Sequence, residues 1–131
     1  MSTTTTNPGI TGIGQISIIV QDLERATGFY RDILGLPLLF TVPGMAFFDC
    51  GGVRLMLGRA ETQELDHPSS ILYFRVPDLN IAHQRLAEQG VAIVAPPRLI
   101  APMGKYDLWM SAFRDSEGNI HQFMSEVPRS T

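Results

Sequence analysis

Several features that mark specialised proteins are scarce or missing in this sequence of 131 residues. It has one cysteine, Cys50, so no internal disulfide can form and a disulfide-stabilised scaffold is excluded. No apolar run approaches the roughly 18 residues that a membrane-spanning helix needs. The 10 Lys and Arg residues are scattered among 13 Asp and Glu, and no basic cluster marks a surface for nucleic acid or an anionic membrane. We therefore expect neither nucleic acid nor membrane as a partner.

Catalytic sequence motifs are missing as well. The chain has no P-loop, no GxGxxG after a strand and no GxSxG. Cys50 lies in the turn sequence DCGG with no histidine beside it, so we interpret it as a packed or turn thiol rather than a nucleophile. His67 and His83 have no partner at metal-ligand spacing; we interpret the first as solvated and the second as lying near the apolar side of a helix.

The N-terminal residues give little sign of regular structure. Residues 1–11 are rich in threonine and lack a hydrophobic pattern, so we expect a disordered tail there. The first residues have neither the basic nor the apolar region of a secretory signal, and we expect a cytoplasmic location. With 44% apolar residues, the part from 12 to 131 is expected to be a single domain with its own core.

What the sequence does contain is an internal repeat. Residues 15–20 alternate with the two-residue period of a strand, Asp22 can cap the helix that follows, and Gly35 suits its C-terminal end. The stretch from residue 71 repeats this order, with Asp78 as the cap. Both copies contain Val-x-Asp-Leu, 56 residues apart.

Three strand-like pieces follow each helix. They are residues 36–42, 45–50 and 53–58 in the first half, and 91–97, 107–113 and 119–126 in the second. The sequence thus predicts an α+β fold of two βαβββ modules that form a curved mixed sheet around a cleft, with the helices on the outer face. We place module one at 12–60, a connection at 61–69 and module two at 70–127.

The least regular segment lies between strands of the second module. Three prolines and a glycine within residues 96–104 break regular structure, so we expect a loop beside the cleft that carries Met103, Lys105 and Tyr106. Trp109 and Phe113 are interpreted as core or dimer-interface residues, with a lid or stacking surface as the alternative.

The repeat and its motifs resemble a known family. The segments VQDLERATGFYRDILGL and VPDLNIAHQRLAEQGV and the ending FRDSEGNIHQFMSE are similar to the vicinal oxygen chelate superfamily, which includes glyoxalase I, extradiol dioxygenases, methylmalonyl-CoA epimerase and the fosfomycin and bleomycin resistance proteins. The resemblance extends from about residue 12 to 127. It implies the fold and a homodimer, because small two-module members commonly pair, but it does not imply one reaction.

The resemblance also implies where a metal would bind. In metal-dependent members the ion is held by the first and last strands of each module, and these positions fall on Gln15, Met56, Ile71 and Gln122. A divalent first-row ion prefers imidazole, thiolate or carboxylate, and two amides, a thioether and a hydrocarbon replace these poorly. We therefore expect no cofactor. The alternative is a weakly held Ni, Zn, Mn or Fe ion on Gln15 and Gln122.

Strand alternation predicts which side chains face the cleft. If Gln122 faces it, Met124 does too and His121 points to the opposite face, unless a bulge after Asn119 reverses the order. The predicted cleft lining is Gln15, Ser17, Arg54, Met56, Ile71, Tyr73, Arg75, Gln122 and Met124.

Two of these residues suggest chemistry. A guanidinium in a partly closed pocket needs an anion, so Arg75 either recognises a carboxylate or phosphate of the ligand, pairs with a nearby Asp or Glu, or reaches water at the mouth. Tyr73 and Gln122 are the candidates for catalytic groups, and packing is the alternative for Tyr73.

The predicted function is that of a glyoxalase-like or bleomycin-resistance-like protein with a degenerate metal site. Its cleft would bind a small organic molecule, anionic if Arg75 recognises it, or convert it without metal. The alternative is a metal-dependent glyoxalase-like lyase or isomerase, or a dioxygenase. Whether the chain is an enzyme at all is left open by these residues.

Overall fold

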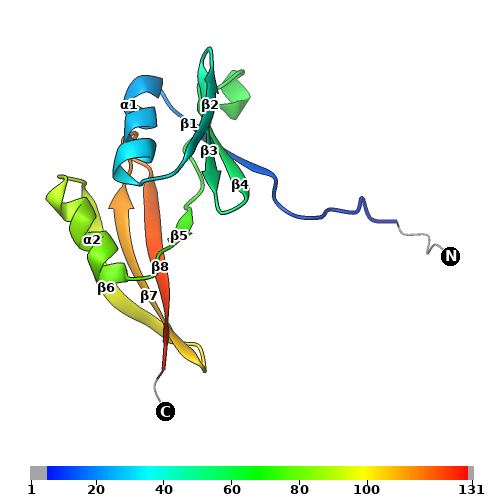
Figure 1. Ribbon diagram of the computed structural model, residues 1–131. Coiled ribbons are helices and arrows are strands. Elements are labelled where there is room, and N and C mark those ends of the chain that lie inside the picture. The colour runs from blue at the N-terminus through cyan, green and yellow to red at the C-terminus, as the bar shows by residue number, and fades with distance from the viewer. Residues whose placement is uncertain (1–5, 130–131) are drawn as a thin grey trace.

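The computed structural model describes residues 6–129 and contains two βαβββ modules, as the repeat predicts (Figure 1). Residues 1–5 of the expected N-terminal tail lie outside the described part, and residues 6–14 are exposed and form no helix or strand. No helix within residues 6–129 is long and apolar enough to cross a membrane.

Module one forms a four-stranded sheet with one helical segment. Its elements are β1 (Gln15–Ile19), α1 (Leu23–Gly28), η1 (Phe29–Ile33), β2 (Leu38–Val42), β3 (Met45–Cys50) and β4 (Val53–Gly58). The strands are ordered β1-β4-β3-β2. β1 runs parallel to β4, and the other neighbours are antiparallel.

Module two repeats this topology after a connection that contains the short 3-10 helix η2 (Gln63–Leu65). Its elements are β5 (Tyr73–Arg75), α2 (Leu79–Glu88), β6 (Ile93–Pro102), β7 (Tyr106–Arg114) and β8 (Ile120–Pro128). The order β5-β8-β7-β6, with β5 parallel to β8, matches the order in module one.

The two helices begin where the sequence predicts. The Asp22 carboxylate accepts a hydrogen bond from Arg25 N at 3.0 Å, and the Asp78 carboxylate accepts one from Ile81 N at 3.1 Å. The first helix differs from the regular α-helix expected, because it continues from Phe29 as a π-helix. Phe29 and Tyr30, the first two residues of this π-helix, are both buried.

The expectation that the prolines break regular structure is wrong for residues 96–102, whereas Met103 and Lys105 do lie in the expected loop and Tyr106 begins β7. β6 continues through Pro96 and Pro97 to Pro102, so only residues 103–105 connect it to β7. Proline lacks a backbone donor but is tolerated here because β6 is an edge strand. The pairing of β6 with β7 also shifts register at three places, which accommodates the interruptions.

One hydrophobic core extends across both modules. It includes Tyr30 and Phe48 from module one and Leu86, Phe113 and Phe123 from module two. Phe113 is therefore a core residue, and Trp109 packs against this core, in agreement with the preferred interpretation of both.

The turn between β7 and β8 joins module two to module one. The Tyr30 hydroxyl donates a hydrogen bond of 2.6 Å to the buried Asp115 carboxylate. Glu117 accepts hydrogen bonds from Gln21 N at 2.7 Å and from the Arg25 guanidinium at 3.2 Å. Burial and the adjacent Asp115 raise the pKa of Tyr30 far above its usual value, so its hydroxyl stays protonated.

The Asp115 carboxylate accepts more hydrogen bonds than any other carboxylate of this junction. It accepts hydrogen bonds from Glu117 N and Asn119 N at 2.9 Å and from Asn119 Nδ2 at 3.1 Å, as well as from Tyr30. Burial alone would raise the pKa of Asp115. The contacts with His121, Tyr30 and Asn119 outweigh burial and lower this pKa to about 2.

The two sheets remain separate within the described chain. No ladder joins β1 to β5, so each is an edge strand of its own sheet. In Figure 1 the sheet of module one lies above that of module two, and α1 and α2 lie on the same side of the molecule. One face of each sheet is left uncovered by its helix.

Candidate functional site

The uncovered face of module one brings together the four side chains predicted for it. In the parallel pairing of β1 with β4, Gln15 lies beside Arg54 and Ser17 lies beside Met56. The Gln15 side-chain amide donates to the Met56 sulfur at 3.7 Å, and its oxygen accepts from Arg54 Nε at 2.7 Å. This face therefore carries a connected row of guanidinium, amide and thioether.

Two phenylalanines complete this face. The Arg54 guanidinium carbon lies 5.4 Å from the centre of the Phe47 ring. Phe40, on β2, stacks on Phe47 with ring centres 4.6 Å apart. Strand alternation alone did not assign Phe47, because it is followed by Phe48 and the apolar run hides which of the two faces the helix. The antiparallel pairing of Phe47 with Met56 identifies its face.

A cavity of about 400 Å³ opens over the other end of the same face. Ser17 and Met56 line it, and the sequence predicted both as cleft residues. The remaining lining is Ile19, Pro43, Gly44, Met45, Arg59, Glu61, Leu65 and His67. The connection between the modules thus folds back over module one, which composition and periodicity do not reveal.

The uncovered face of module two has the composition predicted for it. Tyr73 pairs with Gln122 and Arg75 pairs with Met124 in the parallel register of β5 and β8. Tyr73 is 49% exposed, and its hydroxyl has no hydrogen-bond partner within residues 6–129. The side-chain oxygen of Gln122 is buried and likewise has no partner there. Ile71 lies just before β5 and is 50% exposed.

Arg75 forms an ion pair on this face. Its Nε donates to the Glu126 carboxylate at 3.0 Å. Of the roles considered for Arg75, the structure therefore shows the pairing with a nearby acid. Glu126 shares the strand parity of Gln122 and Met124, so continuing the alternation along β8 by two residues would have identified this partner.

The three histidines lie away from a shared centre. His121 is fully buried, and its Nδ1 accepts a hydrogen bond from Leu72 N at 3.1 Å. Its Nε2 lies 3.5 Å from Asp115, which is too long for a good hydrogen bond but close enough for attraction. Because β8 has no register shift, the prediction that His121 faces away from the cleft is confirmed. His67 Nδ1 lies 3.0 Å from a backbone oxygen, and His83 is half-buried.

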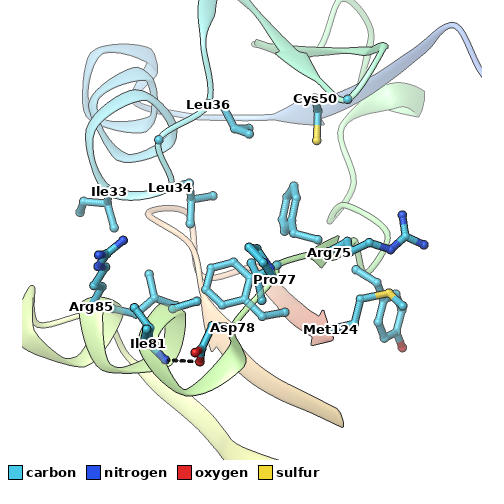
Figure 2. Close-up of a pocket in the computed structure, with 18 of the residues that line it drawn as sticks. Ile33, Leu34, Leu36, Cys50, Arg75, Pro77, Asp78, Ile81, Arg85 and Met124 are labelled. Atoms are coloured by element: carbon cyan, nitrogen blue, oxygen red, sulfur yellow. Dashed lines mark hydrogen bonds between the residues drawn. The ribbon is translucent and has the colours of Figure 1, made fainter. Parts of the chain in front are cut away.

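A second, larger cavity of about 1110 Å³ lies between the modules. Figure 2 shows Leu34, Leu36 and Cys50 of module one across from Pro77 and Ile81 of module two. Burial and the neighbouring Asp49 raise the pKa of the half-buried Cys50 thiol, so the thiol is not activated.

The four positions implied as metal sites differ in the donors they offer. The Gln15 oxygen and the Met56 sulfur are already engaged by Arg54 and by Gln15. Ile71 has no donor atom. Within residues 6–129, no three His, Cys, Asp or Glu side chains are grouped as a metal centre would require.

The two cavities contain residues of different faces. The smaller cavity includes the module-one positions Ser17 and Met56, whereas the larger one includes Tyr73, Arg75 and Met124 of module two. Neither cavity joins the two faces.

Comparison with known proteins agrees with this architecture. The chain is 28% identical over 120 residues to the uncharacterized protein YraH of Bacillus subtilis, which covers 81% of this chain and 91% of that protein. It is 31% identical over 72 residues to the metallothiol transferase FosB of Staphylococcus haemolyticus, a match to 53% of this chain and 52% of the relative.

Solved structures show the same fold. A superfamily member from Sphaerobacter thermophilus superimposes with a TM-score of 0.74 at 24% identity, over 89% of this chain and 98% of the other. A lactoylglutathione lyase from Agrobacterium tumefaciens gives a TM-score of 0.65 at 20% identity, over 91% and 96%. The family model for the glyoxalase, bleomycin resistance protein and dioxygenase superfamily matches residues 12–123. The chain belongs to this superfamily.

Proposed function

We propose that this protein binds a small organic anion in the cleft of its fold, or converts it, without using a metal ion. The observation that carries the proposal is the contact of 2.7 Å between the Arg54 guanidinium and the Gln15 side-chain oxygen. A cation bound at this oxygen would lie beside a fixed positive charge, and the two would repel each other. The donor set of Gln15, Met56, Ile71 and Gln122 does not fit a divalent first-row ion.

The residues of the two faces suit an organic ligand. Met56, Met124 and Ile71 offer flexible apolar contact area, while Ser17 and Tyr73 offer hydroxyl groups. Because the Tyr73 hydroxyl is half-exposed and unengaged by the described residues, it can donate a hydrogen bond to a ligand. Tyr73 and Gln122 remain our candidates for groups that act on a bound molecule.

We also propose that the complete cleft forms in a homodimer, where module one of one protomer faces module two of the other. β1 and β5 are edge strands, and edge strands with exposed apolar neighbours readily pair with another chain. Ile71 and Tyr73 at the β5 edge are each about half exposed. The two cavities of the single chain each contain only one of the predicted faces, which further supports a site completed by a second copy.

Metal binding tests the first part of the proposal. Protein purified without chelator would be analysed for metal content and titrated calorimetrically with Ni(II), Zn(II), Mn(II) and Fe(II). We expect dissociation constants no tighter than about 1 mM for the natural chain. The variant with Met56→Glu, Ile71→His and Gln122→Glu is the positive control and should gain micromolar affinity, because it restores charged and imidazole ligands.

Two outcomes would change the interpretation. Stoichiometric metal in the natural chain that is lost in Gln122→Ala would favour a metal-dependent lyase, isomerase or dioxygenase. Failure of the triple variant to gain metal affinity would contradict the assignment of the four positions. Sedimentation equilibrium tests the dimer, and a monomer at micromolar concentration would contradict a shared cleft.

A further inference from the structure

Arg54 and Arg75 lie on the two uncovered sheet faces but differ in how their charge is balanced. Arg75 is paired with Glu126 at 3.0 Å. Arg54 donates instead to the neutral amide of Gln15, and no carboxylate within residues 6–129 lies within 4.0 Å of its guanidinium. Asp49 is its cross-strand neighbour, but the Asp49 carboxylate accepts from Gly52 N at 3.1 Å. Arg54 therefore keeps an unbalanced positive charge.

Two contacts hold the Arg54 guanidinium in place. Its Nε–H group is bound by the Gln15 oxygen, and its carbon lies over the Phe47 ring at 5.4 Å. Phe47 is itself stacked on Phe40, so the ring has little freedom to move. A guanidinium has five N–H donors, and only the Nε–H is bound among the described residues. The remaining donors form the planar fork that matches the two oxygens of a carboxylate.

An apolar surface adjoins this fork. Met56 follows Arg54 by two residues on the same face of β4 and leads into the cavity of about 400 Å³. Phe40, which is 47% exposed, stacks on Phe47 and extends the apolar surface toward β2. A cavity of this volume accepts a small organic body, since ligand pockets usually measure about 300–1,000 Å³.

We infer that Arg54 binds the carboxylate of an organic acid whose apolar body lies over Met56 and enters the adjacent cavity. The inference rests on the proposed function and deepens it, because it names the ligand class and the residue that selects it. Gln15 and Phe47 are positioning residues: they hold the guanidinium but leave its outer edge to the ligand. The charge recognition considered for Arg75 on sequence grounds is assigned instead to Arg54.

The test uses matched acids and amides. Phenylacetate, 3-phenylpropanoate, 4-phenylbutanoate and 5-phenylpentanoate would be titrated into the full chain by calorimetry or NMR, each beside its primary amide. We expect at least one acid to bind about tenfold more tightly than its amide, because a hydrogen bond to a charged group is stronger than a neutral one. Arg54→Gln should abolish this preference. Arg31→Gln, a matched change at an exposed arginine that lines neither cavity, should retain it, and Arg75→Gln is measured beside these variants.

Arg54→Lys separates charge from geometry, because lysine keeps the charge but lacks the planar fork; an intermediate preference is expected. Two results would overturn the assignment to Arg54 while still supporting a cleft that binds organic molecules. In one, acids and amides bind equally well to the natural chain. In the other, the acid preference is lost in Arg75→Gln but kept in Arg54→Gln. No binding of any acid or amide would instead overturn the proposed function, and the inference with it. Unchanged thermal unfolding of the variants confirms that each result reflects binding.

Discussion

The turn before the last strand of each module begins with an aspartate, and the two aspartates have different partners. Asp49 accepts one hydrogen bond, from Gly52 N within its own turn. Asp115 accepts two backbone hydrogen bonds in its turn and one from Tyr30 of the other module. The repeated topology fixes where these carboxylates lie, while the side chains that reach them have diverged. One turn is local, and the other joins the two halves of the molecule.

The sheet faces diverge in a similar way. Module one holds Arg54 with a neutral amide and an aromatic ring, whereas module two holds Arg75 with the carboxylate of Glu126. Module one thus carries a net charge on its last strand, β4, whereas module two carries a neutral pair between its first and last strands, β5 and β8. The corresponding sheet faces of a duplicated fold can therefore differ in how their charge is balanced.

The largest expected effect tests whether Asp115 and Asp49 differ in how much they stabilise the fold. Asp115→Ala should lower the free energy of unfolding by about 3 kcal/mol, because it leaves buried donors without their acceptor. Asp49→Ala, the matched change in module one, should cost no more than about 1 kcal/mol, since it removes one hydrogen bond near the surface. Urea unfolding of both variants measures the difference, and equal costs would contradict the role of Asp115 at the junction.

The pH dependence of stability also distinguishes Asp115 from Asp49. The pKa of Asp115 is lowered from 3.8 to about 2 in the folded chain, so its contribution is present above about pH 4 and is lost as the pH falls towards 2. The loss should reach about 2 kcal/mol. Asp115→Asn should remove this part of the acid dependence, and Asp49→Asn should leave it unchanged. Unfolding curves recorded from pH 5 down to pH 2 measure it.

The smallest expected effect concerns the sheet faces. Glu126→Gln releases Arg75 from its ion pair, which should raise the affinity for the phenylalkanoates about two- to fivefold in the Arg54→Gln background. Stability should change by less than about 1 kcal/mol, because the pair is largely exposed. The acid and amide titrations measure the effect. If affinity does not rise, the ion pair is not what keeps Arg75 from binding anions.

Periodicity predicted the elements whose signals are local. The caps Asp22 and Asp78 and the face of His121 follow from spacing alone, and the structure confirms them. The length of β6 could not be predicted from periodicity, because its prolines are tolerated only at a sheet edge and the sequence does not say which strand is at the edge.

The site was predictable to a similar degree. The members of each face follow from alternation, but their partners depend on which strands pair. Phe47 joins Arg54 because β3 lies beside β4, and His67 reaches the small cavity because the connection folds back. Neither arrangement leaves a periodic signal in the sequence.

The hydrogen bond between Tyr30 and Asp115 also has a consequence for how the chain acquires its structure. The two residues are 85 positions apart, so this contact closes a long loop and forms only after most of the polypeptide has been synthesised. Until then the Tyr30 hydroxyl lacks its buried acceptor, and the first helix lacks the partner that completes its packing. The contacts of Tyr30 in the N-terminal half are therefore complete only when the last hairpin is in place.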